Sequence, residues 1–146
     1  MRLSVQEAAF DLGAETNQFA AGVAGAGAIV MFIGLVRDNG GALQGMEIEH
    51  YQGMTERAIA LIMEQARDRF RLIDALVIHR FGRLGPAEPI MMVATAAPHR
   101  ADGFAAAEFL MDYLKSRAPF WKKELSSDAS TWVTAKDEDE AALKRW

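Results

Sequence analysis

Pro119 is the residue that most constrains how this chain can fold. Proline has no amide hydrogen for a helical hydrogen bond, and it disfavours helical geometry at the residue before it, here Ala118. A helix that carries Lys115 must therefore end near Ala118, and an extended segment that carries Lys122 must follow. The two lysines thus project from different elements, although they are only seven residues apart.

The side chains around Pro119 have the composition of a reactive site. Phe120 and Trp121 stand between the two lysines and can keep water away from an amine. A lysine that is partly desolvated beside other cations has a lowered pKa and can act as a base or nucleophile at neutral pH. The alternative is a solvated basic helix end that suits the helix dipole, which is the commoner role of a single lysine. The residues alone leave both interpretations open.

Composition predicts one ordinary globular domain over residues 1–146. The chain is long enough to bury a core, and it is 51% hydrophobic and 25% charged. Its net charge of −4 opposes a role in binding nucleic acid, so any anion site must be a local cluster. The absence of cysteine excludes disulfides, thiolate metal sites and a cysteine nucleophile.

Neither a membrane segment nor a metal site is predicted. Glu7 and Asp11 interrupt the start of the chain, unlike a signal peptide, and the apolar run 26–36 is too short to span a bilayer. The three histidines lack metal-ligand spacing, and no cofactor motif is present. We therefore expect a cytoplasmic protein that acts without membrane, metal or cofactor.

Hydrophobic patterns predict an α+β fold with a mainly antiparallel sheet of two hairpins and flanking helices. One hairpin would join strands 28–36 and 44–51 across the turn residues 39–41, and the other would join strands 73–81 and 90–97. The remaining predicted elements are an edge strand at 2–5, a partly helical segment at 6–21, helices at 54–70 and 101–115, and a last strand at 131–134.

Three further features carry structural predictions. Strand 28–36 is almost continuously apolar, which predicts burial on both faces. The acidic run 137–140 is expected to be solvated. Trp146 is expected to dock, on this chain or on a partner subunit, because a free indole in water is unfavourable.

Cations stand beside several of these elements. Arg37 follows strand 28–36, and His99 and Arg100 precede helix 101–115, whose amino terminus is suited to bind an anion. If these cations converge with the two lysines, they form a pocket for a phosphorylated or otherwise anionic small molecule. If they do not converge, each of these cations is an ordinary surface residue. His79, near the end of strand 73–81, is interpreted as a structural histidine.

Five motifs in order closely resemble the large, catalytic subunit of molybdopterin synthase, over nearly the whole chain. They are Phe32–Asp38, Glu49–Met54, His79–Leu84, His99–Phe104 and Met111–Glu124. The resemblance implies an α/β-hammerhead-like fold and a sulfurtransferase of molybdenum cofactor biosynthesis. Such enzymes convert cyclic pyranopterin monophosphate to molybdopterin by inserting sulfur as a dithiolene.

The resemblance also implies partners. The sulfur arrives as a thiocarboxylate on the C-terminal Gly-Gly of a small ubiquitin-like carrier subunit. The large subunit forms a homodimer, and a carrier bound at each end completes a heterotetramer. Because the sulfur never needs to be held by this chain, the absence of cysteine agrees with that scheme.

The resemblance assigns roles to particular residues of this sequence. Lys115 and Lys122 would be the catalytic pair and would also bind substrate. The other substrate-binding residues would be Leu35, Val36, Arg37, His99, Arg100, Lys123 and Glu124, with Phe32 and Met111 as apolar lining. Which lysine activates the thiocarboxylate, and whether one or both subunits supply the pocket, stays open.

Two other functions remain at this stage. One is an enzyme that acts on another phosphorylated metabolite in the same pocket. The other is a non-catalytic adaptor that binds a ubiquitin-like protein, for which the two lysines would matter only to affinity.

Overall fold

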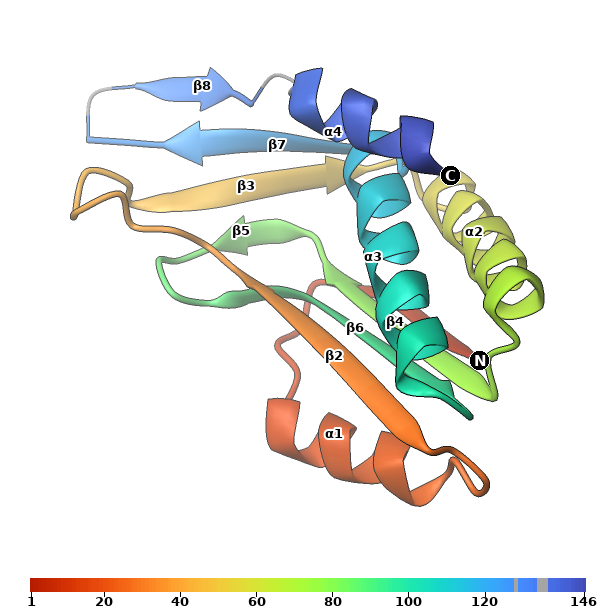
Figure 1. Cartoon of the computed structure of the whole chain (residues 1–146). Coiled ribbons are helices and arrows are strands. Elements are labelled where there is room, and N and C mark those ends of the chain that lie inside the picture. The colour runs from red at the N-terminus through yellow and green to blue at the C-terminus, as the bar shows by residue number, and fades with distance from the viewer. Residues whose placement is uncertain (128, 134–136) are drawn as a thin grey trace.

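The computed structural model describes residues 1–127, 129–133 and 137–146. Its strands and helices form two sheets with helices packed around them (Figure 1). The elements in chain order are β1 (Arg2–Gln6), α1 (Leu12–Ala21), β2 (Ala28–Leu35), β3 (Gly45–His50), α2 (Met54–Phe70), β4 (Asp74–Arg80), β5 (Gly82–Leu84), β6 (Pro89–Ala97), α3 (Arg100–Ser116), β7 (Phe120–Leu125), β8 (Ser130–Trp132), α4 (Asp137–Ala142) and the 3-10 helix η1 (Leu143–Arg145).

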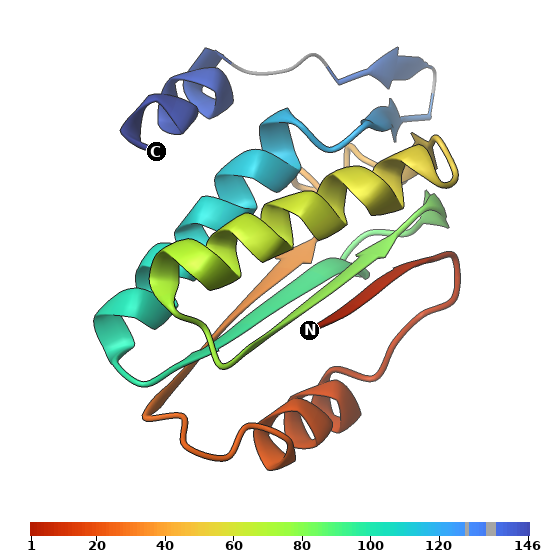
Figure 2. The same ribbon diagram turned by 90° about the vertical axis from the view of Figure 1, so that its right-hand side faces the viewer.

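The first sheet has the strand order β1-β4-β6-β2 and lies between helices on both faces (Figure 2). Its β1–β4 pair is parallel, and its other pairs are antiparallel. Alternate side chains of β4 point to opposite faces. Leu76 belongs to the cluster with Phe19 of α1, whereas Val77 belongs to the cluster with Ile59 of α2 and Phe109 of α3.

The second sheet has the order β5-β3-β7-β8 and is antiparallel throughout. The chain passes from the first sheet to the second at Phe81 and Gly82, where Gly82 takes the left-handed φ of 81° that favours glycine. The register places Lys122 of β7 opposite Ile48 of β3, which is buried. Because directly opposed residues of an antiparallel pair share a face, Lys122 points to the inner side of this sheet.

The predicted α+β class and the largely antiparallel pairing are confirmed. Helix 54–70 is present with those bounds, and the second predicted hairpin is the antiparallel β4–β6 pair. The edge strand at the amino terminus is β1. The last predicted strand is β8, and Thr134 at its predicted end lies outside the described residues. No helix among the described residues is both long and apolar enough to cross a membrane.

The first predicted hairpin is wrong. The turn at residues 39–41 forms, with left-handed φ at Asn39, Gly40 and Gly41, but β2 and β3 belong to different sheets. The backbone N–H of Val36 donates to Glu88 in the β5–β6 loop, whereas that of Gln44 donates to Leu125 at the end of β7. A turn signal fixes the local reversal, but the strands pair with whichever partners the tertiary structure offers.

The prediction that strand 28–36 is buried on both faces is also wrong for this chain. β2 is an edge strand of the first sheet, and Ile29, Ile33 and Leu35 are 36%, 39% and 51% exposed. Its other side packs on α3, where an added Cβ at Gly103 would lie 3.3 Å from Val30. The apolar sequence of β2 therefore reflects a surface that this chain alone leaves uncovered.

The acidic run expected to be solvated forms α4, which lies beside the end of α3 (Figure 1). Arg117 forms an ion pair with Glu140 at 2.6 Å, and the Ser116 hydroxyl donates to the Asp139 carbonyl oxygen at 2.9 Å. Trp146 docks on its own chain, as one of the two predicted possibilities. Its ring lies 5.4 Å from that of Phe109, between α2 and α3.

Candidate active site between two lysines

The end of α3 and the start of β7 place the two lysines, as the Pro119 argument predicts. α3 ends at Ser116, and the backbone N–H groups of Arg117 and Ala118 both donate to the carbonyl oxygen of Tyr113, at 2.7 and 3.2 Å. The buried Thr55 hydroxyl of α2 then donates to the Pro119 carbonyl oxygen at 3.3 Å. This bond fixes the turn against α2, so that β7 leaves at a set angle from α3.

Both lysines line one cavity of about 610 Å³ between α3, β7 and the end of β2. Most of the predicted site residues meet there: Phe32, Leu35, Arg37, Met111, Lys115, Lys122 and Glu124. The convergence of Arg37 with the lysines is the arrangement that an anionic ligand requires. The particular roles of these residues stay predictions.

Lys122 is the more perturbed of the two amines. Burial lowers its pKa first, and the nearby Lys115 cation lowers the pKa further, while Asp139 opposes the shift. Lys115 is 52% exposed, and its Nζ lies 4.0 Å from Asp139 Oδ1. The pocket thus pairs a desolvated amine with an exposed one at its mouth.

The walls of the cavity are largely apolar, and β2, β6 and α3 supply much of them. β2 contributes Phe32 and Leu35, and α3 contributes Met111, one turn before Lys115, and Leu114, which directly precedes it. Met91 of β6 packs closely on Gly34 of β2, since a Cβ at Gly34 would lie only 3.1 Å from Met91 Cγ. Both residues line the cavity. Apolar walls around a few charged groups are typical of small-molecule sites.

Four predicted site residues do not line the cavity. Val36 is buried, and its backbone bonds to Ala87 and Glu88. Lys123 lies on the opposite face of β7, with its Nζ 5.0 Å from the ring centre of Trp132. His99 and Arg100 are exposed at the amino end of α3, where a rise of 1.5 Å per residue places them about 22 Å from Lys115.

Several cavity residues were not predicted as site residues. His79 was interpreted as structural, but it lines the cavity and stacks on Phe120 with ring centres 3.7 Å apart and planes 15° apart. Asp139 comes from the acidic run of α4. The signal for His79 was present, since it is a polar residue at the end of an otherwise apolar face, after Ala75 and Val77. Trp121, expected beside the lysines, instead points outward against Tyr51.

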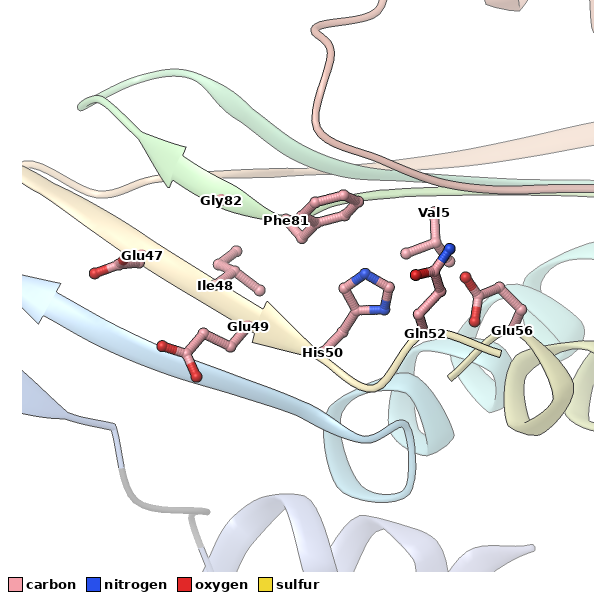
Figure 3. A pocket seen from close by; sticks show the side chains of 9 residues that line it. All are labelled: Val5, Glu47, Ile48, Glu49, His50, Gln52, Glu56, Phe81 and Gly82. Carbon is pink, nitrogen blue, oxygen red and sulfur yellow. The ribbon is translucent and has the colours of Figure 1, made fainter. Parts of the chain in front are cut away.

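A second cavity, of about 570 Å³, has the opposite charge (Figure 3). Its lining includes Glu47, Glu49 and Glu56 beside His50 and Phe81, and none of the described lysines or arginines lines it. An anionic substrate would be repelled there. No group of three or more metal-ligating side chains that could hold an ion occurs among the described residues.

Fold and cavity together define a small α+β protein with one cavity lined by two lysines and an arginine. The model of the MoaE protein family matches residues 5–117. The chain therefore belongs to the MoaE family. The predicted resemblance is thereby confirmed.

Curated relatives and solved structures agree with this membership. The molybdopterin synthase catalytic subunit of Cereibacter sphaeroides is 72% identical over the full length of both chains. The molybdopterin biosynthesis MoaE protein of Burkholderia ambifaria has a TM-score of 0.84 at 47% identity, covering 99% of this chain and 97% of its own. A complex of subunits 1 and 2 of the molybdopterin-converting factor from Helicobacter pylori shares the fold, with a TM-score of 0.77 at 19% identity over 92% of this chain and 91% of that one.

Proposed function

We propose that this chain is the catalytic subunit of a molybdopterin synthase that transfers sulfur from the thiocarboxylate of a small carrier subunit to cyclic pyranopterin monophosphate. The observation that carries the proposal is the convergence of Lys115, Lys122 and Arg37 on one apolar-walled cavity in a chain of the MoaE family. The product is the dithiolene of molybdopterin.

The environments of the lysines support a division of labour. Burial and the nearby Lys115 lower the pKa of Lys122, so more of its amine is neutral near neutral pH, and we assign it proton exchange with the pterin. Lys115 stays exposed at the mouth, where an entering chain end arrives first. We assign it the orientation of the thiocarboxylate by its charge.

Arg37 is the proposed contact for the substrate phosphate, because a guanidinium pairs well with phosphate oxygens. Met111 and Phe32 would pack on the pterin ring, while Glu124 and the backbone of Leu35 would complete the wall.

His99 and Arg100 can join this pocket only from a second copy, since they lie about 22 Å from Lys115 on the same helix. A homodimer is therefore part of the proposal. It is supported by the exposed apolar edge strand β2, which also borders the cavity.

The carrier subunit belongs to the same proposal. The Helicobacter pylori neighbour was solved as a complex of two subunits, which supports a partner subunit for this chain. The assembly that we propose is a heterotetramer, with a carrier at each end of a homodimer. The carrier's C-terminal Gly-Gly thiocarboxylate would enter as an extended peptide. We further propose that residues 1–146 act as one domain of this type and that the reaction takes place in the cytoplasm, where metabolites and carrier subunits are made.

The experiment is reconstitution with thiocarboxylated carrier and cyclic pyranopterin monophosphate, followed by detection of the dithiolene product. The wild type should form product. Lys115→Ala and Lys122→Ala should form none while still binding the carrier. Lys144→Ala, an exposed lysine of η1 outside the cavity, is the matched control and should behave as wild type. Normal product formation by Lys115→Ala would remove the basis of the proposal.

A further inference from the structure

His79 is held in one orientation and one tautomer. Its side chain is 1% exposed and lies parallel to the ring of Phe120. Its Nδ1 lies 2.8 Å from the carbonyl oxygen of Arg80. A carbonyl oxygen only accepts, so Nδ1 must carry the hydrogen and donate it. The other ring nitrogen, Nε2, is then left with a free lone pair.

His79 lines the lysine cavity, and its Nδ1 is occupied by the Arg80 carbonyl oxygen, so Nε2 is the ring nitrogen left for a ligand. Among the described residues, only Nδ1 of His50 is both sealed from solvent and without a hydrogen-bond partner. Nε2 of His79 has no hydrogen-bond partner among the described residues and is not one of their sealed, unpaired atoms. The small exposed surface of His79 lies on the lysine-lined cavity, and the acidic cavity does not include this residue.

The ring cannot serve as a general base or as a cation. Burial, and then the charge of Lys122, lower the pKa of His79 to about 3. A base with so low a pKa holds almost no proton near neutral pH, and the ideal catalytic pKa lies near the operating pH. What remains is a fixed neutral acceptor, in a pocket whose cations, Arg37, Lys115 and Lys122, are all donors. The carboxylates of Glu124 and Asp139 also line the cavity, so His79 is its uncharged ring acceptor.

We infer that His79 is a substrate-contacting residue, whose Nε2 accepts a hydrogen bond from an N–H or O–H group of the bound heterocycle. The inference rests on the proposed function, and it deepens that function by assigning a selectivity element. The cations hold the anionic groups of the substrate, whereas His79 favours a ring that presents a donor. A ring that presents only acceptors would leave Nε2 unpaired, which is unfavourable in a desolvated site.

Two variants separate this role from a structural one. In His79→Asn the amide nitrogen can still donate to the Arg80 carbonyl, but no acceptor reaches the cavity. In His79→Gln the longer side chain places an amide oxygen near the position of Nε2. Loss of one such bond costs about 1 to 1.4 kcal/mol, which corresponds to a five- to tenfold loss of affinity.

The assay is single-turnover dithiolene formation by the assembled complex at increasing cyclic pyranopterin monophosphate. His79→Asn should raise the half-saturating concentration about five- to tenfold, with the maximal rate and carrier affinity unchanged. His79→Gln should stay within about threefold of wild type. Wild-type half-saturation in His79→Asn, or equal losses in both variants that follow their melting temperatures, would overturn the inference.

A measurement on the wild-type protein tests the same contact if the variants fail to fold. The ¹⁵N resonance of His79 Nε2 should move when cyclic pyranopterin monophosphate is added to the complex, because its lone pair becomes an acceptor. An unchanged resonance at saturating substrate would refute the contact. Failure of the proposed function is seen separately, as a wild-type complex that forms no dithiolene at all.

Discussion

Replacing Trp146 tests how the C-terminal segment is held over the active site. The indole packs between α2 and α3, and the segment before it places Asp139 at the mouth of the cavity. In Trp146→Ala the hydrogen bond that the Arg69 side chain donates from Nη1 to the main-chain carbonyl oxygen of residue 146, 2.7 Å long, can persist, but the ring contacts are lost. We expect residues 137–146 to detach locally while the two sheets stay folded.

The magnitude follows from the contacts that are removed. The indole lies 5.8 Å from Phe70 and 5.4 Å from Phe109, both edge-on, and such aromatic pairs are worth about 1 kcal/mol each. Its Nε1 donates to Asp112 Oδ2 at 2.7 Å, which adds about 1 kcal/mol at a half-exposed position. The free energy that favours docking of the C-terminal segment should therefore fall by about 3 kcal/mol. The equilibrium constant for docking then falls roughly 100-fold.

Hydrogen exchange read by mass spectrometry measures this opening. Amides of residues 137–146 should exchange up to about 100-fold faster in Trp146→Ala, while those of β6 keep their wild-type protection. Trp146→Phe is the matched control. It keeps an aromatic ring but loses the Nε1 bond, so the tail should open only about fivefold more often.

One outcome would refute this reasoning. If the tail keeps its wild-type exchange rate while β6 loses protection, the indole supports the global fold and does not anchor the segment. A Trp146→Phe variant as open as Trp146→Ala would instead show that the Nε1–Asp112 bond, rather than ring packing, holds the tail.

Two further predictions concern titration. Asp139 raises the pKa of Lys122, whereas burial and Lys115 lower it, so Lys122 should lose its proton at lower pH in Asp139→Asn. The pH dependence of Lys122 labelling by an amine reagent measures this shift. A shift to higher pH would contradict the assigned charges. For His79 the pKa is about 3 in the folded protein and 6.5 in the unfolded chain, so between these values only the unfolded chain binds the proton. Stability should therefore fall as pH drops from 6.5 towards 3, by at most about 1.4 kcal/mol per pH unit, and denaturant unfolding of His79→Gln should show a flatter dependence. Equal slopes for the variant and the wild type would mean that other groups cause the acid sensitivity.

Local chemistry made the lysine site predictable. The effect of Pro119 on its neighbours is a short-range steric rule, and it correctly required Lys115 and Lys122 to lie on different elements. Helix 54–70 was also predictable from local sequence, because the spacing of its apolar residues is a property of the segment itself. Lys123 could not be placed correctly by motif alone, since a shift of one residue along a strand reverses the face on which a side chain lies.

Contacts between distant segments decided the rest. The sequence by itself determined the class of fold, the two lysines and their separation by Pro119. Only the tertiary structure decided that β2 pairs with β6 and not with β3, that His79 opens on the cavity, and that His99 and Arg100 lie far from the lysines in one chain. The physical reason is range: sterics and periodicity act over a few residues, whereas strand partners and pocket membership depend on packing across the whole chain.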